Sequence, residues 1–462
     1  MSVIAALAVP HPPLIFPEVG QGAEAYIQET INAYREAMAF AASLKPDTLV
    51  IASAHATAYG DYFHISPGLG AEGDFEKFDA PEVKVKVNYD LAFTGVLSDL
   101  CKENHIEAGT MAERDKALDH GTMIPLRFFK EAYKGSFKVV RMGLSGLSPL
   151  THYKLGQMVQ QTAEKLNRRV VFIASGDLSH KMSPDSPYGF VPEGPAFDEV
   201  AVTALGELDF LPLLTLDDSL CTRAAECGRR AFLIMAGALD KKAIEGGVLS
   251  YEGPFGVGYT VAAYQVTGED AGRNLLEQYE ALKEAEAAKQ RETEDVYQQL
   301  ARYALEGRIH GKEIPPLPEE LASKIPGEPR ACFVSIYEEG HLRGCVGTTG
   351  ALKESLAQEI MENAVAAGTC DPRFAPVSPL ELPKLSYSVD VLSPLEAIPD
   401  KTGLDPKVYG VLVQAGDKEG LLLPDLEGVD TVSDQLRIAK KKAGIGDLEQ
   451  VSLFRFTVER HG

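Results

Sequence analysis

Apolar runs of strand length alternate with amphipathic helical stretches along the first 266 residues of the chain. Such uninterrupted apolar runs are typical of strands that are buried on both faces of a sheet. The predicted strands are Val3–Val9, Thr48–Ala54, Val139–Gly143, Val170–Ala174 and, as a closing strand, Val257–Val266, and the predicted helices include Gly22–Ala42, Thr151–Lys165 and Ala224–Leu239. The pattern predicts a three-layer α/β domain with a largely parallel or mixed sheet.

The composition changes after residue 266. Residues 267–289 are rich in Glu, Lys, Ala and Gln, which predicts a solvated helical linker. In residues 290–462, strand-like runs such as Leu385–Leu392 mix with helical stretches such as Val432–Ala443 without strict alternation. This mixed order of strands and helices predicts a second, smaller α+β domain.

Three histidines closely follow predicted strands. His11 comes two residues after the first strand, His55 directly follows the second, and His180 ends the segment after the fourth. The ligand crevice of an open parallel sheet lies beyond the carboxyl ends of its strands, so these side chains can converge there. A single histidine at a strand end is more often a surface or hydrogen-bonded residue. Three of them indicate a candidate divalent-metal site, because neutral imidazole binds iron, zinc and copper.

A metal ion held by two histidines often takes a carboxylate as its third ligand. Glu226 lies in the first turn of the predicted helix Ala224–Leu239, where an ion pair with Arg230 is the simpler explanation of its presence. Cys227 is a rival ligand or a small core residue, and Glu252 is more typical of a turn. The residues alone leave the third ligand open.

Charge and composition narrow the classes of partner. The net charge of −22 argues against nucleic acid and anionic membranes, since both require a basic surface. No apolar run reaches the ~18 residues of a membrane span, and the apolar start of the chain lacks the basic region of a signal peptide. We therefore expect a cytoplasmic protein. The six cysteines include no CxxC pair and do not predict a disulfide framework.

Four short motifs together resemble the class III extradiol dioxygenases of the LigB type, whose fold the Memo proteins share. In chain order they are Val9–Pro13, Ser53–His55, Asp119–Gly121 and Ser175–His180. Each motif is weak alone, but their ordered set across residues 1–266 is fairly specific. The resemblance implies a facial triad of two histidines and one carboxylate that holds Fe(II), with Zn or another divalent metal as the alternative.

The resemblance also assigns roles to individual residues. It makes His11 and His55 the two histidine ligands and Glu226 the carboxylate ligand. Memo proteins place a cysteine before a glycine at that point, which matches Cys227 and keeps both candidates in play. His180 matches the acid/base residue of the dioxygenases, and His120 matches a histidine of the catalytic pocket.

The activity that this resemblance implies is the opening of a small aromatic ring by O2. The substrate would be a catechol or an aminophenol, whose adjacent heteroatoms chelate iron. His180 would accept the substrate proton and return it as the ring opens. Related dioxygenases are often homo-oligomers, and analogy extends that expectation to this chain.

Residues 290–462 resemble the AMMECR domain, a family without a settled activity. The motifs Leu342–Thr348 and Asp371–Phe374 carry the resemblance. Within the first motif, Arg343 beside Cys345 would favour a reactive thiolate, although a small packed cysteine in a tight turn is the simpler explanation. The two domains in one chain resemble a component of the AmmeMemoRadiSam system, which is associated with a Memo-like protein and a radical SAM protein.

Two functions of different classes therefore stand side by side. The first is an iron-dependent ring-cleaving dioxygenase fused to an AMMECR domain of unknown role. The second is a non-catalytic, Memo-like metal-binding adaptor that acts with a radical SAM protein. Tight metal binding through Cys227 without turnover would favour the second.

Overall fold

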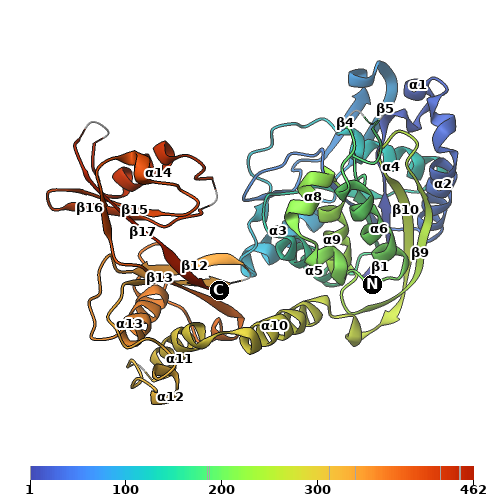
Figure 1. Ribbon diagram of the computed structural model, residues 1–462. Coiled ribbons are helices and arrows are strands. Elements are labelled where there is room, and N and C mark those ends of the chain that lie inside the picture. Colours follow the sequence, from blue (N-terminus) through green and yellow to red (C-terminus); the bar gives the residue numbers. More distant parts are fainter. Residues whose placement is uncertain are drawn as a thin grey trace. The chain divides into compact units, whose positions relative to one another are not determined.

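The computed structural model describes residues 2–462 except 185, 187, 312, 339, 427, 447 and 448. The chain divides into two compact units, Met1–Tyr279 and Glu280–Gly462, which Figure 1 colours blue to yellow-green and yellow to red. The helix α10 (Leu275–Thr293) spans the boundary between them. Among the described helices, none is both long enough and apolar enough to cross a membrane.

The first unit is built on a six-stranded sheet with the strand order β7-β2-β8-β1-β10-β9. In that order the strands are Lys138–Gly143, Thr48–Ser53, Val170–Ser175, Val3–Val9, Tyr259–Glu269 and Lys242–Glu252. The first four run parallel, and β10 and β9 continue the sheet in antiparallel pairing. The α/β class predicted from the apolar runs is confirmed, with a mixed sheet.

Both faces of the four parallel strands are buried. In β1, Leu7 and Val9 point into one core, whereas Ala6 and Ala8 point into the other. This alternation explains why the strand is apolar at every position. One face is covered by α2 (Gln28–Ser43) and α4 (His120–Ala132), and the other by α3 (Leu91–Glu103), α5 (Pro149–Lys165), α6 (Glu193–Gly206) and α9 (Arg229–Ala238).

The predicted helix Ala224–Leu239 covers the last residue of one helix and the whole of the next. The first, α8 (Asp218–Ala224), ends where Ala225 takes the left-handed conformation with φ 54° and ψ 42°. The second, α9, begins only at Arg229. Glu226 and Cys227 therefore lie in the loop between the helices, and the placement of Glu226 in a first helical turn is wrong.

The second unit contains two four-stranded antiparallel sheets with the orders β12-β11-β13-β18 and β14-β17-β15-β16. The strands of the first are His341–Gly347, Cys332–Glu338, Leu385–Leu392 and Val458–His461, and those of the second are Glu396–Ile398, Ser452–Phe456, Gly410–Ala415 and Lys418–Leu422. Helices α11 (Val296–Gly311) and α13 (Leu356–Thr369) share a core with the first sheet, and α14 (Val432–Lys442) shares one with the second. The predicted smaller α+β domain is confirmed.

Candidate metal centre

Three neighbouring parallel strands bring the candidate residues to one edge of the sheet. Val9 of β1 and Ser53 of β2 both pair with Ser175 of β8, so these residues stand side by side. His11 and His55 come two positions after Val9 and Ser53, where the chain leaves the sheet. The expected convergence of strand-end histidines therefore follows from the register of the parallel strands.

A third histidine, His120, joins this pair at the start of α4. The Nε2 atoms of His11 and His55 lie 3.1 Å apart, and the rings of His55 and His120 have centroids 4.0 Å apart. One ligand atom from each of the three lies within 4.8 Å of the others. His11 is buried, His120 is half-buried and His55 is exposed.

Ser175 fixes which nitrogen of His11 is free. The Ser175 hydroxyl donates its only proton to the carbonyl oxygen of Gly121 at 2.6 Å. At 3.1 Å from His11 Nδ1, the same hydroxyl oxygen must therefore accept a proton from that nitrogen. The lone pair of His11 is thus on Nε2, which faces His55. Such outer hydrogen bonds commonly orient metal-binding histidines.

The three imidazoles are neutral at physiological pH. Burial, together with the nearby His55, lowers the pKa of His11 to about 3, and burial with the same neighbour lowers the pKa of His120 to about 3. Burial also lowers the pKa of His55. Neutral imidazole is the form that binds metal ions, so the cluster is prepared for this role.

Asp177 and Cys227 both lie close to His11. Asp177 Oδ1 accepts the backbone N–H of His11 at 2.7 Å, and Cys227 Sγ lies 3.6 Å from His11 Nε2. Cys227 Sγ also accepts the backbone N–H of Asp177 at 3.2 Å. His11, Asp177 and Cys227 form a second group whose ligand atoms lie within 4.8 Å of one another.

The loop that carries Cys227 touches the end of β8 through two glycines. A Cβ atom on Gly176 would lie 2.3 Å from the Cα atom of Gly228, so no larger residue fits there without movement of the backbone. This contact holds Cys227 beside Asp177. The positions of both donors therefore depend on glycines that the sequence alone did not single out.

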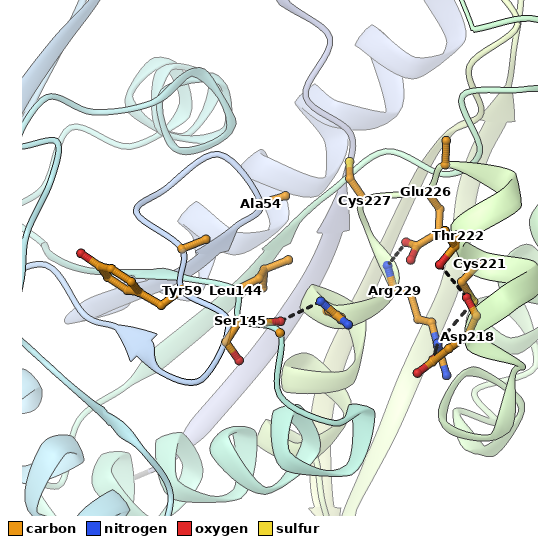
Figure 2. Close-up of a pocket in the computed structure, with 15 residues that line it drawn as sticks. Ala54, Tyr59, Leu144, Ser145, Asp218, Cys221, Thr222, Glu226, Cys227 and Arg229 are labelled. Carbon is orange, nitrogen blue, oxygen red and sulfur yellow. Dashed lines mark hydrogen bonds and ion pairs between the residues drawn. The ribbon is translucent and has the colours of Figure 1, made fainter. Parts of the chain in front are cut away.

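Glu226 lies in the loop just before α9. Its carboxylate accepts the backbone N–H of Arg229 at 2.8 Å and so caps the start of α9. Figure 2 shows this bond, with the sulfur of Cys227 directed elsewhere. Neither donor group found among the described residues includes Glu226. The ion pair expected between Glu226 and Arg230 is also absent from the described residues. Arg230 instead donates to the carbonyl oxygen of Ser145 at 2.7 Å.

His180, the candidate acid/base residue, lies beside Asp177. Its Nδ1 lies 2.5 Å from the carbonyl oxygen of Ala225, which can only accept, so Nδ1 carries the proton in the neutral ring. The free Nε2 lies 3.9 Å from Asp177 Oδ2. His180 is therefore oriented to take up a proton at Nε2. Glu252 has no part in this group, since its Oε1 accepts the backbone N–H of Thr30 at 2.6 Å.

Two cavities border the donor cluster. One, of about 660 Å³, is lined by Cys227, Tyr59 and Arg230 among others (Figure 2). The other, of about 950 Å³, is lined by residues that include His55 and His120. Both have the size of a small-molecule site. Neither Tyr59 nor Arg230 could be predicted from the sequence to line a cavity, because neither belongs to a motif or a strand end.

A buried histidine supports the wall of the smaller cavity. The backbone N–H of Ser145 donates to His152 Nε2 at 3.3 Å, and His152 Nδ1 lies 2.9 Å from the carbonyl oxygen of Ser148. These two contacts require a neutral His152 ring that carries its proton on Nδ1. Burial lowers the pKa of His152 to about 4.

Comparison with known proteins agrees with the two-unit architecture. The family model described as the catalytic LigB subunit of aromatic ring-opening dioxygenase matches residues 5–262, and the AMMECR1 model matches residues 298–461. Protein CA_C1420 of Clostridium acetobutylicum is 37% identical over all of this chain and 99% of its own length. A protein of Thermotoga maritima is 53% identical over 33% of this chain and 88% of its own length.

Solved structures add weaker likenesses. Uncharacterized protein PH0010 from Pyrococcus horikoshii covers 36% of this chain and 88% of its own at 26% identity, with a TM-score of 0.33. Uncharacterized protein JW3007 from Escherichia coli K12 covers 56% of this chain and 99% of its own at 15% identity, with a TM-score of 0.36.

The buried His152 predicts a specific dependence of stability on pH. Its pKa is lower in the folded chain than in the unfolded chain, so between about pH 6.5 and about pH 4 only the unfolded chain is protonated there. This residue therefore destabilises the fold as the pH falls through that range. We expect the free energy of unfolding of the wild type, relative to His152→Gln, to fall by up to about 3 kcal/mol from about pH 7 to about pH 4.

Urea denaturation of the two proteins across this range measures the difference. The His152→Gln variant is the matched control for the other histidines and buried carboxylates, which it retains. Parallel pH profiles of the wild type and the variant would show that His152 does not titrate in this way.

Proposed function

Because this chain belongs to the LigB family over residues 5–262 and carries an AMMECR1 domain over residues 298–461, we propose that its first unit is an iron-dependent, extradiol-type dioxygenase. Its substrate would be a catechol- or aminophenol-like aromatic, opened with O2. The observation that carries the proposal is the meeting of the His11 and His55 Nε2 atoms at 3.1 Å beside two cavities. The AMMECR1 domain receives no role in this reaction.

The donor set fits a divalent metal ion. The lone pair of His11 Nε2 is directed toward His55 because Ser175 holds the other nitrogen, and burial keeps the imidazole neutral. Cys227 Sγ lies 3.6 Å from His11 Nε2 in the group with Asp177, whereas His120 completes the group with His11 and His55. We assign the ion to His11 and His55, with Cys227 as the third donor that we propose. When bound, Fe(II) would bring substrate and O2 together at its open positions.

His180 is the residue best placed to move the substrate proton. Its Nδ1–H is engaged by the Ala225 carbonyl, so an incoming proton is taken up at Nε2. The Asp177 carboxylate, 3.9 Å from that nitrogen, stabilises the imidazolium that results. His180 then returns the proton to the opened product. His120 lines the larger cavity as a neutral imidazole and is assigned to binding of the substrate.

A second candidate function has its own support. With Cys227 as the third ligand, sulfur would take the place of the carboxylate of the facial triad, and sulfur is a softer ligand that suits zinc or copper as well as iron. This ligand set matches the Memo-like alternative, a metal-binding adaptor without turnover that acts with a radical SAM protein. Metal analysis and an oxygen assay separate the two functions.

Metal content tests the ligand assignment. In protein purified without oxygen and loaded with Fe(II), we expect His11→Ala and Cys227→Ser to lower the affinity for iron at least about tenfold, because each removes a donor. Glu226→Gln should retain the wild-type stoichiometry, since this carboxylate caps α9. Mass spectrometry of the bound metal measures the outcome.

The exposed His310 in the second unit provides a control, as His310→Ala removes an imidazole outside the site. Loss of iron from Glu226→Gln, with full retention by Cys227→Ser, would reverse the assignment of the third ligand.

Oxygen uptake tests the activity. With iron bound, we expect a panel of catechols and aminophenols to include a substrate that consumes O2. His180→Ala should lower the rate about 10²- to 10⁴-fold at unchanged iron content, because it removes the proton acceptor and no proposed ligand. An oxygen electrode and metal analysis of the same samples give both values. If the fully loaded wild type consumes no oxygen with any member of the panel, the adaptor function is favoured.

A further inference from the structure

The second unit has a cavity of its own, of about 360 Å³, on the face of the β12-β11-β13-β18 sheet. We call it the Cys345 cavity; its lining includes Ser335, Cys345, Ser388, Leu421, Leu423 and Lys442. All of these residues belong to one compact unit. The cavity is therefore independent of the site in the first unit.

The floor of the Cys345 cavity is a row of small polar side chains. In β11, Val334 and Ile336 point into the helix-covered core, so Ser335 points to the opposite face. Ser335 pairs with Cys345 on one side and with Ser388 on the other. These three neighbouring strands thus present one thiol and two hydroxyl groups side by side.

The thiol of Cys345 is held within this row. Ser335 donates its hydroxyl proton to Cys345 Sγ at 3.3 Å, and Ser335 is buried. The backbone N–H of Cys345 donates to Asp371 Oδ2 at 2.9 Å. Cys345 itself is half-buried and lines the cavity, so a small molecule inside would meet the sulfur.

The cation next to the thiol is not the one that the sequence indicated. Arg343, adjacent in the chain, forms an ion pair with Glu381 at 2.7 Å. The pairing of β12 with β11 shifts register at Arg343, between Leu342 and Gly344, and Arg343 is not among the residues that line the cavity. The structure instead directs Arg373, Arg460 and Lys442 to the cavity.

Two of these three cations are already neutralised. Arg373 pairs with Asp371 at 2.7 Å, and Arg460 pairs with Asp390 at 2.7 Å. For Lys442, the described residues provide no ion pair. Burial and the nearby Arg373 lower the pKa of Lys442 from its usual value, whereas Cys345 raises it. The cavity is left with one positive charge beside a nucleophilic thiol.

The remaining wall is apolar. Leu421 lies in β16, and Leu423 and Leu426 follow that strand and line the same cavity. A ligand that satisfies both walls carries one negative charge and a short apolar body, and a volume of about 360 Å³ admits only a small one.

We propose that the Cys345 cavity is a binding site for a small organic carboxylate. Lys442 attracts the carboxylate group, the leucines cover the apolar body, and Cys345 contacts the bound molecule through its sulfur. This site belongs to the AMMECR1 domain and is separate from the metal centre, so it stands or falls independently of the dioxygenase proposal.

Alkylation with a matched pair of reagents tests this proposal on the full-length chain. Iodoacetate carries a carboxylate and iodoacetamide is its neutral counterpart. The exposed Cys370 in the same unit is the internal reference. We expect the ratio of the iodoacetate rate to the iodoacetamide rate to be about two- to fivefold higher at Cys345 than at Cys370, because one nearby charge favours the anion.

Variants of Lys442 identify the charge. Lys442→Met should bring the ratio at Cys345 down to that at Cys370, and Lys442→Arg should preserve the wild-type ratio. Peptide mass spectrometry gives the rate at each thiol. Equal ratios at the two thiols of the wild type, or a preference that survives Lys442→Met, would overturn the proposal.

A competition experiment needs no variant. Butyrate should slow the reaction of Cys345 with iodoacetamide and leave Cys370 unaffected, while butyramide, which has the same shape without the charge, should protect neither thiol. Protection of Cys345 by both compounds would show an apolar pocket without anion recognition, and protection by neither would show that no small carboxylate binds. Either result contradicts the proposal.

Discussion

The parallel pairing of β1 and β2 with β8 is the constraint on which the candidate metal centre depends. Val9 and Ser53 stand beside Ser175 in the same row of the sheet, and the residues two positions further on are His11, His55 and Asp177. Ser175, in the middle strand, sets the tautomer of His11. A shift of one residue in either pairing would turn these side chains to the wrong face. The convergence of these side chains at one edge of the sheet is therefore a consequence of the hydrophobic pattern that fixes the register of the strands.

The sequence was sufficient for those parts in which local pattern and tertiary structure agree. The parallel strands are apolar at every position because both of their faces are buried, and their ends located His11 and His55. The strands β9 and β4 (Gly70–Phe75) were not predicted, because exposed positions and charged residues interrupt their apolar positions. The break at Ala225 also escaped, since a left-handed alanine leaves no trace in the composition. Cys227 meets His11 across 216 positions of sequence, and no local pattern encodes such a contact.

The choice between Glu226 and Cys227 illustrates how backbone geometry decides chemistry. The residues are adjacent in a loop, so one side chain that faces His11 leaves its neighbour directed elsewhere. The contact between Gly176 and Gly228 pins this loop to the end of β8. The start of α9 leaves backbone N–H groups without helical partners, and Glu226 satisfies one of them. The carboxylate thus caps the start of α9, and the thiol of Cys227 is the group that lies near His11.

The two sites differ in how firmly the strands determine them. In the second unit, Cys345, Ser335 and Ser388 lie within paired strands, so the polar floor of their cavity and the core beneath, with Val334 and Ile336, follow from one register. A substitution that loosens that pairing would disturb the cavity and the core together. In the first unit the donors lie beyond the last paired residues, on loops that can change while the sheet stays intact. The strands fix His11 and His55, whereas the third donor that we propose, Cys227, lies on a loop whose course is set by the left-handed turn at Ala225.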